Sequence, residues 1–372
     1  MTPYRPAFVE IDLAALRQNA LWLRERIGRE TAFYAVVKGD AYGIGVEAAV
    51  AVLAEAGADA FAAGDFDEAM IVRRLRPDIP VLLYGSYAPD QLPQLAQHGI
   101  ILTVYSAECL DALASFGQPV TVSFKVDCGF GRLGLREDAI GEALQRLGRR
   151  PGTTVRGLYT HLGAVDDAAA LAVQTERFAA ARRQAEEAGF HDLEYMLASS
   201  RIVIDHPELV SNAVNPGRLL YGLLERPWRY RVPVRPVIRA VKSRLIQVKE
   251  LEQGRRYGYG QAGGHLSSGS RVGVAAIGFA SGVPRSPCGA EVLVAGEYAP
   301  IIGLASMEHL LLDLSRAPQA KVGDEVVLVG EQGGRAITGE DFADRVGMSE
   351  LEILPRLARG LRRRYLTAGE PA

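Results

Sequence analysis

The sequence predicts an α/β protein with a (β/α)8, TIM-like barrel followed by a C-terminal all-β domain. Two features support this fold class. Short β-rich runs alternate with helical patterns over about the first 225 residues, and from about residue 233 short strands replace the helical periods. At 372 residues, the chain also exceeds the size at which a single hydrophobic core usually stops growing.

Eight strand candidates occur in the first part of the chain. They are residues 33–39, 60–65, 81–86, 101–106, 120–127, 155–162, 195–200 and 214–222. Helical patterns separate them, at residues 45–57, 67–77, 90–99, 107–117, 137–150, 169–189 and 200–209. Several of these helices end at glycine, the residue that helix C-termini favour. The same alternation also permits a doubly wound open sheet, which is the alternative fold.

We expect three segments along the chain. Residues 1–12 form an N-terminal strand that joins the β domain, residues 13–232 form the barrel, and residues 233–372 form the β domain. A last helical pattern spans residues 349–365 and contains several arginines, which we interpret as a solvated face or a cation-rich helix end.

The composition excludes several classes of protein. With 48% hydrophobic and 23% charged residues and a net charge of −2, the chain is typical of soluble globular proteins, without the basic stripe of a nucleic-acid binder. No signal peptide or membrane-spanning run is present, so we expect a cytoplasmic protein with no membrane partner. The three cysteines are scattered and the six histidines lack ligand spacing, so we expect free thiols and no metal.

Polar residues near the C-terminal ends of the strands are the candidates for chemistry, because active sites of such barrels lie there. They are Lys38, Tyr42, Lys125, Asp127, Arg132, His161, Ser199, Ser200, Asn215 and Gly217. A desolvated lysine has a lowered pKa and can form a Schiff base. The alternatives are structural: Lys38 could extend to solvent, Asp127 could cap a turn, and His161 could be a core residue.

The stretch "VVKGDAYGIG", which contains Lys38, resembles the pyridoxal-phosphate motif of the alanine racemase family, enzymes of fold type III. Decarboxylases of the same fold have a related lysine segment. Further segments resemble the racemases in family order: "FKVDCGFGRLG" (Lys125, Arg132), "LYTHLG" (His161), "ASSRI" (Ser200), "GRRYGYG" (Tyr259) and "SMEHLLLDLS" (Met307). Tyr259 could otherwise be one more tyrosine of the β domain.

The resemblance implies a pyridoxal 5'-phosphate-dependent amino-acid racemase, an isomerase that interconverts L- and D-amino acids. Lys38 and Tyr259 are the two bases, with the tyrosine supplied by the other subunit of a homodimer. Tyr42, Ser200 and the backbone of Gly217 and Arg218 hold the cofactor phosphate.

The remaining roles follow from the same resemblance. Arg132 contacts the cofactor's phenolic oxygen and the substrate carboxylate, His161 lies against the ring, and Met307 meets the substrate carboxylate. Lys125 stands where many members carry a carbamylated lysine.

The sequence also departs from the family. Asn215 replaces an arginine that, in the racemases, faces the pyridine nitrogen and keeps it unprotonated. The related decarboxylases have a glutamate at this position, which keeps the nitrogen protonated. The side-chain amide of asparagine is neutral and can either donate or accept a hydrogen bond. Leu351 and Phe279 replace tyrosines near the expected substrate entrance, and Glu308 replaces an aspartate. These changes leave the amino acid substrate open, along with two other functions: a decarboxylase or lyase of the same fold, and a cofactor-binding protein without turnover.

Overall fold

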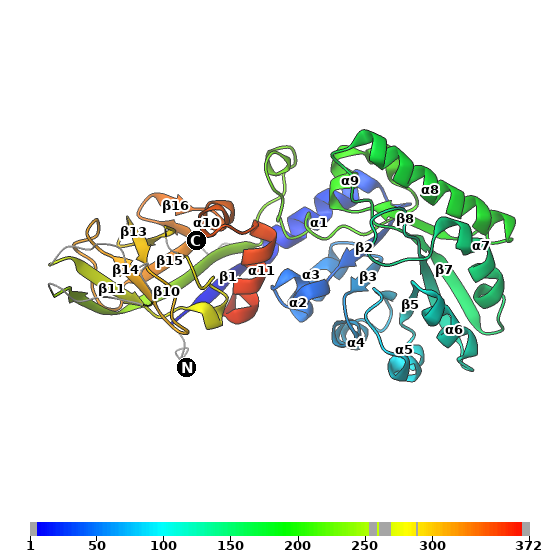
Figure 1. Cartoon of the computed structure of the whole chain (residues 1–372), viewed down its shortest axis with the longest axis horizontal. Helices are drawn as coiled ribbons and strands as arrows, with labels where there is room; N and C mark the ends of the chain where they lie inside the picture. The colour runs from blue at the N-terminus through cyan, green and yellow to red at the C-terminus, as the bar shows by residue number, and fades with distance from the viewer. Residues whose placement is uncertain (1–5, 253–258, 260–268, 288, 367–372) are drawn as a thin grey trace.

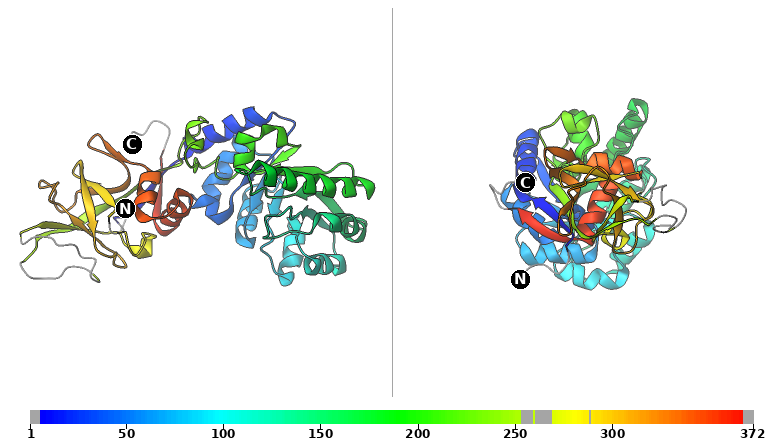
Figure 2. Two further views of the ribbon diagram at one scale, coloured as in Figure 1. Left: turned by 45° about the horizontal axis from the view of Figure 1, so that its top comes forward. Right: turned by 90° about the vertical axis from the view of Figure 1, so that its left-hand side faces the viewer.

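The computed structural model describes residues 6–252, 259, 269–287 and 289–366. It has two parts placed end to end, the barrel on the right of Figure 1 and the β domain on the left. The left view of Figure 2 shows the same elongated arrangement. Helix α1 (Leu13–Ile27) and strand β10 (Ile238–Glu250) lie near the junction of the two parts.

Eight parallel strands close into a barrel, which confirms the predicted fold class and excludes the open sheet. They are β2 (Ala32–Val36), β3 (Ala60–Ala63), β4 (Val81–Leu83), β5 (Ile101–Val104), β6 (Val120–Lys125), β7 (Thr153–Tyr159), β8 (Glu194–Ala198) and β9 (Ala213–Val214). The first and last strands pair with each other, with Ala32 opposite Ala213. The last strand is shorter than the sequence predicts, because the chain turns after Val214.

Helices cover the outside of the barrel. They are α1, α3 (Val46–Glu55), α4 (Phe66–Leu75), α5 (Leu92–Gln97), α6 (Ala107–Ser115), α7 (Ile140–Ala143), α8 (Ala168–Glu187) and α9 (Ser200–Asp205). The short segment α2 (Lys38–Tyr42) follows β2 and has left-handed backbone angles at several positions. Several of the helices begin at a side-chain cap: Asp12, Asp65 and Ser106 accept hydrogen bonds from the first turns of α1, α4 and α6. None of the helices in the described ranges combines the length and apolar character that a membrane crossing requires.

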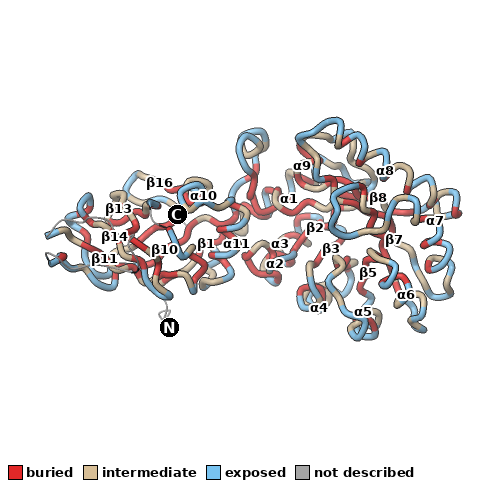
Figure 3. Tube along the Cα trace, viewed as in Figure 1, coloured by how far each residue is buried: buried red, intermediate tan, exposed pale blue. Residues whose placement is uncertain are grey.

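The strands of the barrel are largely buried (Figure 3), and the side chains around them pack in two clusters. Aliphatic side chains between strands and helices form the larger cluster. A smaller cluster lines the inside of the barrel and includes Tyr34, Leu82, Ile101, Tyr159 and Met196. The barrel is therefore a packed core, with its chemistry confined to one end.

The β domain contains a nine-stranded sheet in the order β16-β15-β12-β13-β14-β11-β10-β1-β17. Besides β10, its strands are β1 (Phe8–Asp12), β11 (Arg271–Ala275), β12 (Glu291–Val294), β13 (Glu297–Ile302), β14 (Leu310–Asp313), β15 (Glu325–Gln332), β16 (Arg335–Ile337) and β17 (Arg362–Leu366). The N-terminal strand β1 pairs antiparallel with β10. Among the described residues of this domain, two α-helices accompany the sheet: α10 (Gly339–Val346), which the sequence did not predict, and α11 (Glu350–Gly360).

The predicted helix over residues 349–365 is wrong at its C-terminal end. The helix ends at Gly360, where a side chain would collide with the backbone oxygen of Ser281 at 2.6 Å. Residues 362–366 instead form β17, which pairs parallel with β1 because that strand offers a free edge. Arg356 and Arg359 do lie on a solvated face, but Arg363 does not: it forms an ion pair with Asp40 of the barrel.

Candidate active site

The C-terminal ends of the barrel strands, here called the barrel mouth, bring together most of the predicted site residues. Lys38 follows β2 by two positions, Lys125 is the last residue of β6, His161 follows β7 by two positions, and Asn215 follows β9 directly. The positive charges of Lys125, Arg132 and Lys38 each influence the pKa of His161, which places all four side chains in one electrostatic environment.

The chain turns sharply after Lys38. Segment α2 is a left-handed turn, in which Gly39, Asp40 and Ala41 have φ values of 66°, 57° and 51°, and Tyr42 follows at 54°. Left-handed backbone costs a non-glycine residue about 1–2 kcal/mol, so neighbouring contacts must hold this conformation. The turn carries Lys38 and Tyr42 toward the same end of the barrel.

Both domains supply contacts that hold the turn. The Glu68 carboxylate accepts hydrogen bonds from the backbone N–H groups of Asp40 (2.7 Å) and Gly64 (2.8 Å). From the β domain, Arg363 pairs with the Asp40 carboxylate and the Tyr365 hydroxyl donates to the Ile44 carbonyl at 2.8 Å. Strand β17 therefore helps to fix the loop that positions Lys38.

Lys38 has the lowered basicity that a nucleophilic amine needs. Although the residue remains accessible to solvent, desolvation by the surrounding protein lowers its pKa below 10.5, and the charge of Arg132 lowers it further. The carboxylate of Glu68 opposes this shift. More of the amine is therefore unprotonated at neutral pH than for a free lysine.

Lys125 and His161 are also perturbed by burial. The Lys125 pKa falls to about 7, mainly through desolvation, and its Nζ lies 4.9 Å from the centre of the Tyr159 ring. The Lys125 amine forms no hydrogen bond or ion pair with the described residues, although the Lys125 backbone carbonyl accepts a hydrogen bond from the Leu135 N–H at 2.8 Å. Burial followed by the charges of Lys125 and Arg132 lowers the His161 pKa to about 4, so the imidazole is neutral at physiological pH. The charge of Arg132 lowers the pKa of Lys38, Lys125 and His161 alike, so this guanidinium is the cation at the mouth that would attract an anionic ligand.

Tyr42, Ser200 and Gly217 form a polar cradle at one side of the mouth. The Ser200 Oγ accepts hydrogen bonds from the backbone N–H groups of Gly217 and Leu219, both at 3.1 Å, so its own proton is free to donate. The Tyr42 ring stacks on Tyr221 with a centroid distance of 4.6 Å. A Cβ at Gly217 would lie 2.1 Å from the Tyr42 oxygen, so only glycine lets this hydroxyl approach the backbone.

Asn215 and Arg218 flank the cradle, and their side chains differ in whether every polar atom has a hydrogen-bond partner. Arg218 donates to Glu225 at 2.7 Å and to the Leu223 carbonyl at 3.2 Å, so its side chain turns away from the cradle. The Asn215 Nδ2 donates to the Tyr84 hydroxyl at 3.1 Å, while its Oδ1 is buried and accepts no hydrogen bond from the described residues. This oxygen is the orphaned acceptor at the mouth.

Tyr259 and Met307 belong to the β domain, and no hydrogen bond, ion pair or ring contact joins either of them to the described barrel-mouth residues. Tyr259 is 56% exposed, and the Arg285 guanidinium lies 4.9 Å from its ring and 5.2 Å from that of Phe279. Met307 and Glu308 are exposed in the loop before β14, and Leu351 is partly buried on α11. The rest of the predicted "GRRYGYG" motif, and Cys288, lie outside the described residues, whereas Cys109 and Cys128 are free thiols.

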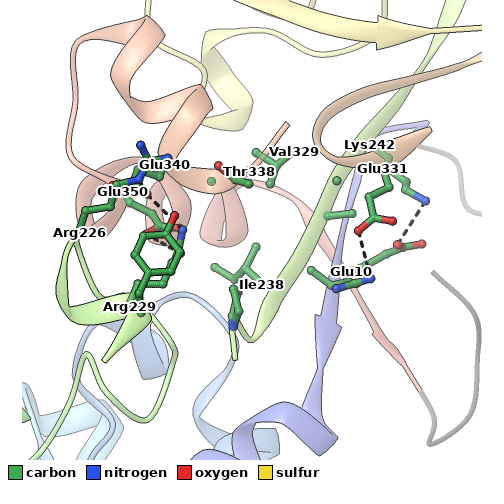
Figure 4. Close-up of a pocket in the computed structure, with 16 residues that line it drawn as sticks. Glu10, Arg226, Arg229, Ile238, Lys242, Val329, Glu331, Thr338, Glu340 and Glu350 are labelled. Carbon is green, nitrogen blue, oxygen red and sulfur yellow. Dashed lines mark hydrogen bonds and ion pairs between the residues drawn. The ribbon is translucent and has the colours of Figure 1, made fainter. Parts of the chain in front are cut away.

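A separate pocket of about 290 Å³ lies in the β domain and the segment that leads to it (Figure 4). Its charged residues largely satisfy one another: Arg229 donates to Glu350 at 2.6 Å, and Lys242 lies 3.3 Å from Glu10. It contains none of the predicted site residues. The described residues hold no cluster of three or more His, Cys, Asp or Glu side chains suited to a metal ion.

Two residues at the mouth were missed by the sequence reasoning. Tyr84 lies within a predicted strand end, and Glu68 within a predicted helix. Tyr84 could have been noticed as a polar residue at the end of its strand, where the other candidates were sought. Nothing in the sequence pattern indicates that Glu68 reaches the backbone of the turn after Lys38.

Comparison with known proteins agrees with this geometry. Residues 11–225 match the family "Alanine racemase, N-terminal domain" and residues 238–365 match "Alanine racemase, C-terminal domain". An alanine racemase from Nostoc sp. is 31% identical over 94% of this chain and 92% of its own length.

Solved structures are similar over the whole chain. The alanine racemase of Bacillus anthracis with bound L-Ala-P has a TM-score of 0.91 and 27% identity, covering 100% of this chain and 97% of that protein. The biosynthetic alanine racemase of Pseudomonas aeruginosa has a TM-score of 0.83 and 30% identity, covering 98% and 100%. These similarities span both domains and do not favour the decarboxylase interpretation. The chain therefore belongs to the alanine racemase family and is an amino-acid racemase dependent on pyridoxal phosphate.

Proposed function

We propose that Lys38 binds the cofactor aldehyde covalently and then serves as one of two bases in racemisation. The observation that supports this role most strongly is the Lys38 amine itself, which has a lowered pKa and is held at the barrel mouth by contacts from both domains. When bound, pyridoxal phosphate supplies an electron sink that makes the α-proton of an amino acid removable. The lysine would then move that proton on one face of the substrate.

The cradle fits the phosphate of this cofactor. Tyr42 and Ser200 would donate hydroxyl protons to it, and the backbone at Gly217 and Arg218 would line it. The free proton of Ser200 and the space left by the missing side chain of Gly217 support this assignment. The Arg218 side chain is engaged by Glu225, so we assign Arg218 a backbone role only.

Further residues would orient the cofactor ring and the substrate carboxylate. Arg132 would contact the phenolic oxygen of the cofactor and the substrate carboxylate, and neutral His161 would lie against the ring. Met307 would meet the substrate carboxylate through its backbone. Lys125 has an amine that is partly neutral near pH 7, the form that reacts with carbon dioxide, and a carbamate there would replace one positive charge beside Arg132 with a negative one.

Racemisation needs a proton donor on each face of the substrate, and we assign the second face to Tyr259 of the partner subunit. In one chain, Tyr259 is exposed on the β domain, apart from the described barrel-mouth residues. A homodimer that places this surface over the partner's barrel mouth would complete two shared sites. The cytoplasmic location expected from the sequence remains a prediction.

We propose a small L- or D-amino acid as substrate, with alanine the first to test, although Phe279 and Leu351 lack the hydroxyl groups of the residues they replace. The reconstituted protein is incubated with single L-amino acids in deuterium oxide, and α-deuterium, chirality and carbon dioxide are measured. We expect α-deuterium together with the D-isomer and no carbon dioxide. Carbon dioxide release would support a lyase. If no amino acid gains α-deuterium, changes chirality or releases carbon dioxide, the result would support a binding protein without turnover.

A further inference from the structure

The loop that follows β6, residues 126–135, is held in shape by Asp127. The Oδ1 atom of Asp127 accepts hydrogen bonds from the backbone N–H groups of Gly129 and Gly131, both at 3.0 Å. At the base of the loop, the Asp127 N–H donates to the Leu135 carbonyl at 2.9 Å. Because the loop is closed at its base and folded around one carboxylate, the side chains in its middle have defined positions.

Phe130, in the middle of this loop, packs on the segment that follows β7. Its ring meets the His161 ring edge-on, with a centroid distance of 4.9 Å and an interplanar angle of 83°. A Cβ at Gly163 would lie 2.5 and 2.8 Å from two carbons of the Phe130 ring, so only glycine leaves room for the ring. The Gly163 N–H donates to the Gln174 Oε1 at 3.1 Å, which ties this segment to α8. Phe130 is therefore held in place although it is 42% exposed.

The Arg132 guanidinium lies over the Phe130 ring, with its central carbon 4.6 Å from the ring centre. This distance is within the roughly 6 Å over which a guanidinium and an aromatic face attract each other. Arg132 is exposed, and its side chain forms no hydrogen bond or ion pair with the residues that the structure describes. An exposed arginine would otherwise sample many rotamers. The Phe130 ring is therefore the contact that restricts where this cation lies.

We propose that Phe130 is a positioning residue, which holds the Arg132 guanidinium at the barrel mouth in the orientation that binds the substrate carboxylate. The inference rests on the proposed contact between Arg132 and that carboxylate. A guanidinium that contacts a ring through its face keeps the N–H groups at its edge free to donate to an anion. Phe130 would thus act through Arg132 and would not contact the reacting atoms itself.

The first test compares Phe130→Leu, which removes the aromatic ring, with Phe130→Tyr, which keeps it. Racemisation kinetics give kcat and KM for the turned-over amino acid, and acetate, as a competing carboxylate, gives an inhibition constant. Phe130→Leu should raise KM and the inhibition constant roughly 3- to 10-fold and change kcat less than about twofold, because the carboxylate contact is the same in the ground and transition states. Phe130→Tyr should keep the wild-type values.

The second measurement needs no cofactor. Phenylglyoxal modifies exposed guanidinium groups, and peptide mapping by mass spectrometry gives the rate at Arg132 in the apoprotein. We expect faster modification, and weaker protection by acetate, in Phe130→Leu than in the wild type, because the ring no longer covers one face of the guanidinium. Gly163→Ala should have the same effect by displacing the ring, and it provides the test if Phe130→Leu does not fold. Val173→Ala, at an exposed apolar position of α8, should change neither quantity.

A double variant shows whether Phe130 acts through Arg132. Arg132→Gln alone should raise KM and the acetate inhibition constant, and adding Phe130→Leu should raise them no further. The inference alone is overturned if Phe130→Leu matches the wild type in KM or in the modification of Arg132, if Phe130→Tyr loses as much as Phe130→Leu, or if the two losses add in the double variant. If Arg132→Gln binds the amino acid and acetate as tightly as the wild type, the proposed role of Arg132 and this inference both fall.

Discussion

Replacing Gly217 with alanine tests whether the cradle depends on close approach of the Tyr42 hydroxyl. The new Cβ would lie 2.1 Å from the Tyr42 oxygen and 2.9 Å from the ring carbon that bears it, so the ring must move. Gly217 does not have a left-handed backbone, and alanine therefore adds a contact without adding backbone strain. Stacking on Tyr221 opposes the movement of Tyr42.

The expected cost follows from overpacking and from the lost hydrogen bond. Overpacking a closely packed site costs about 1–3 kcal/mol of stability. Losing one hydrogen bond to a charged phosphate costs about 1.5–3 kcal/mol, which weakens cofactor affinity roughly 10- to 150-fold. Urea unfolding of the apoprotein measures the first cost, and equilibrium titration with pyridoxal phosphate, followed by absorbance, measures the second.

Matched variants make this prediction specific. Gly117→Ala adds a methyl group where no atom lies within 4 Å and should change neither quantity. Tyr42→Phe removes only the hydroxyl and should reproduce the affinity loss, so the double variant should lose less affinity than the sum of the two single losses. If Gly217→Ala binds the cofactor as tightly as Gly117→Ala, the hydroxyl does not contribute to the cradle and this reasoning is refuted.

Two other predictions concern charge. The folded pKa of Lys125 is about 7 against an ordinary 10.5, so between these values the unfolded chain holds a proton that the folded chain lacks, and stability of the apoprotein should rise with pH across this window. Lys125→Met should therefore stabilise the apoprotein at about pH 6 in urea unfolding and flatten this rise; an unchanged pH profile would argue against a neutral Lys125. Arg363→Met breaks the partly buried ion pair with Asp40, so it should lower the free energy of unfolding by about 1–3 kcal/mol and weaken cofactor uptake. The control Arg362→Met, at an exposed position, should change neither quantity. Equal effects of the two variants would show that β17 does not hold the turn after Lys38.

Much of the barrel was predictable because its strands are short apolar runs with breaks between them. Segments such as β3 and β5 are buried along their whole length, so their sequence pattern is nearly independent of context. Residues 362–366 could not be assigned in this way. Their sequence continues the charged helical pattern, and only the free edge of β1 makes them a strand.

In the candidate site, too, some residues could be placed from the sequence and others could not. Lys38, Lys125 and His161 follow or end predicted strands, so the barrel prediction alone places them at one end. The partners that hold or orient the site are distant in sequence: Arg363 lies 323 positions from Asp40, and Asn215 lies 131 positions from Tyr84. Such pairs depend on how the chain packs, and no local pattern predicts them.

The most direct test of the central claim, a two-base site shared between subunits, is complementation between two inactive variants. Lys38→Ala and Tyr259→Phe proteins are purified separately, unfolded, mixed, refolded together and assayed for racemisation of the turned-over amino acid. A mixed dimer would hold one site with both residues intact, so the account predicts that activity absent from each variant alone returns in the mixture, to roughly a quarter of the wild-type level if subunits pair at random. Activity no greater than the sum of the two variants, in a mixture shown to contain mixed dimers, would contradict a shared site.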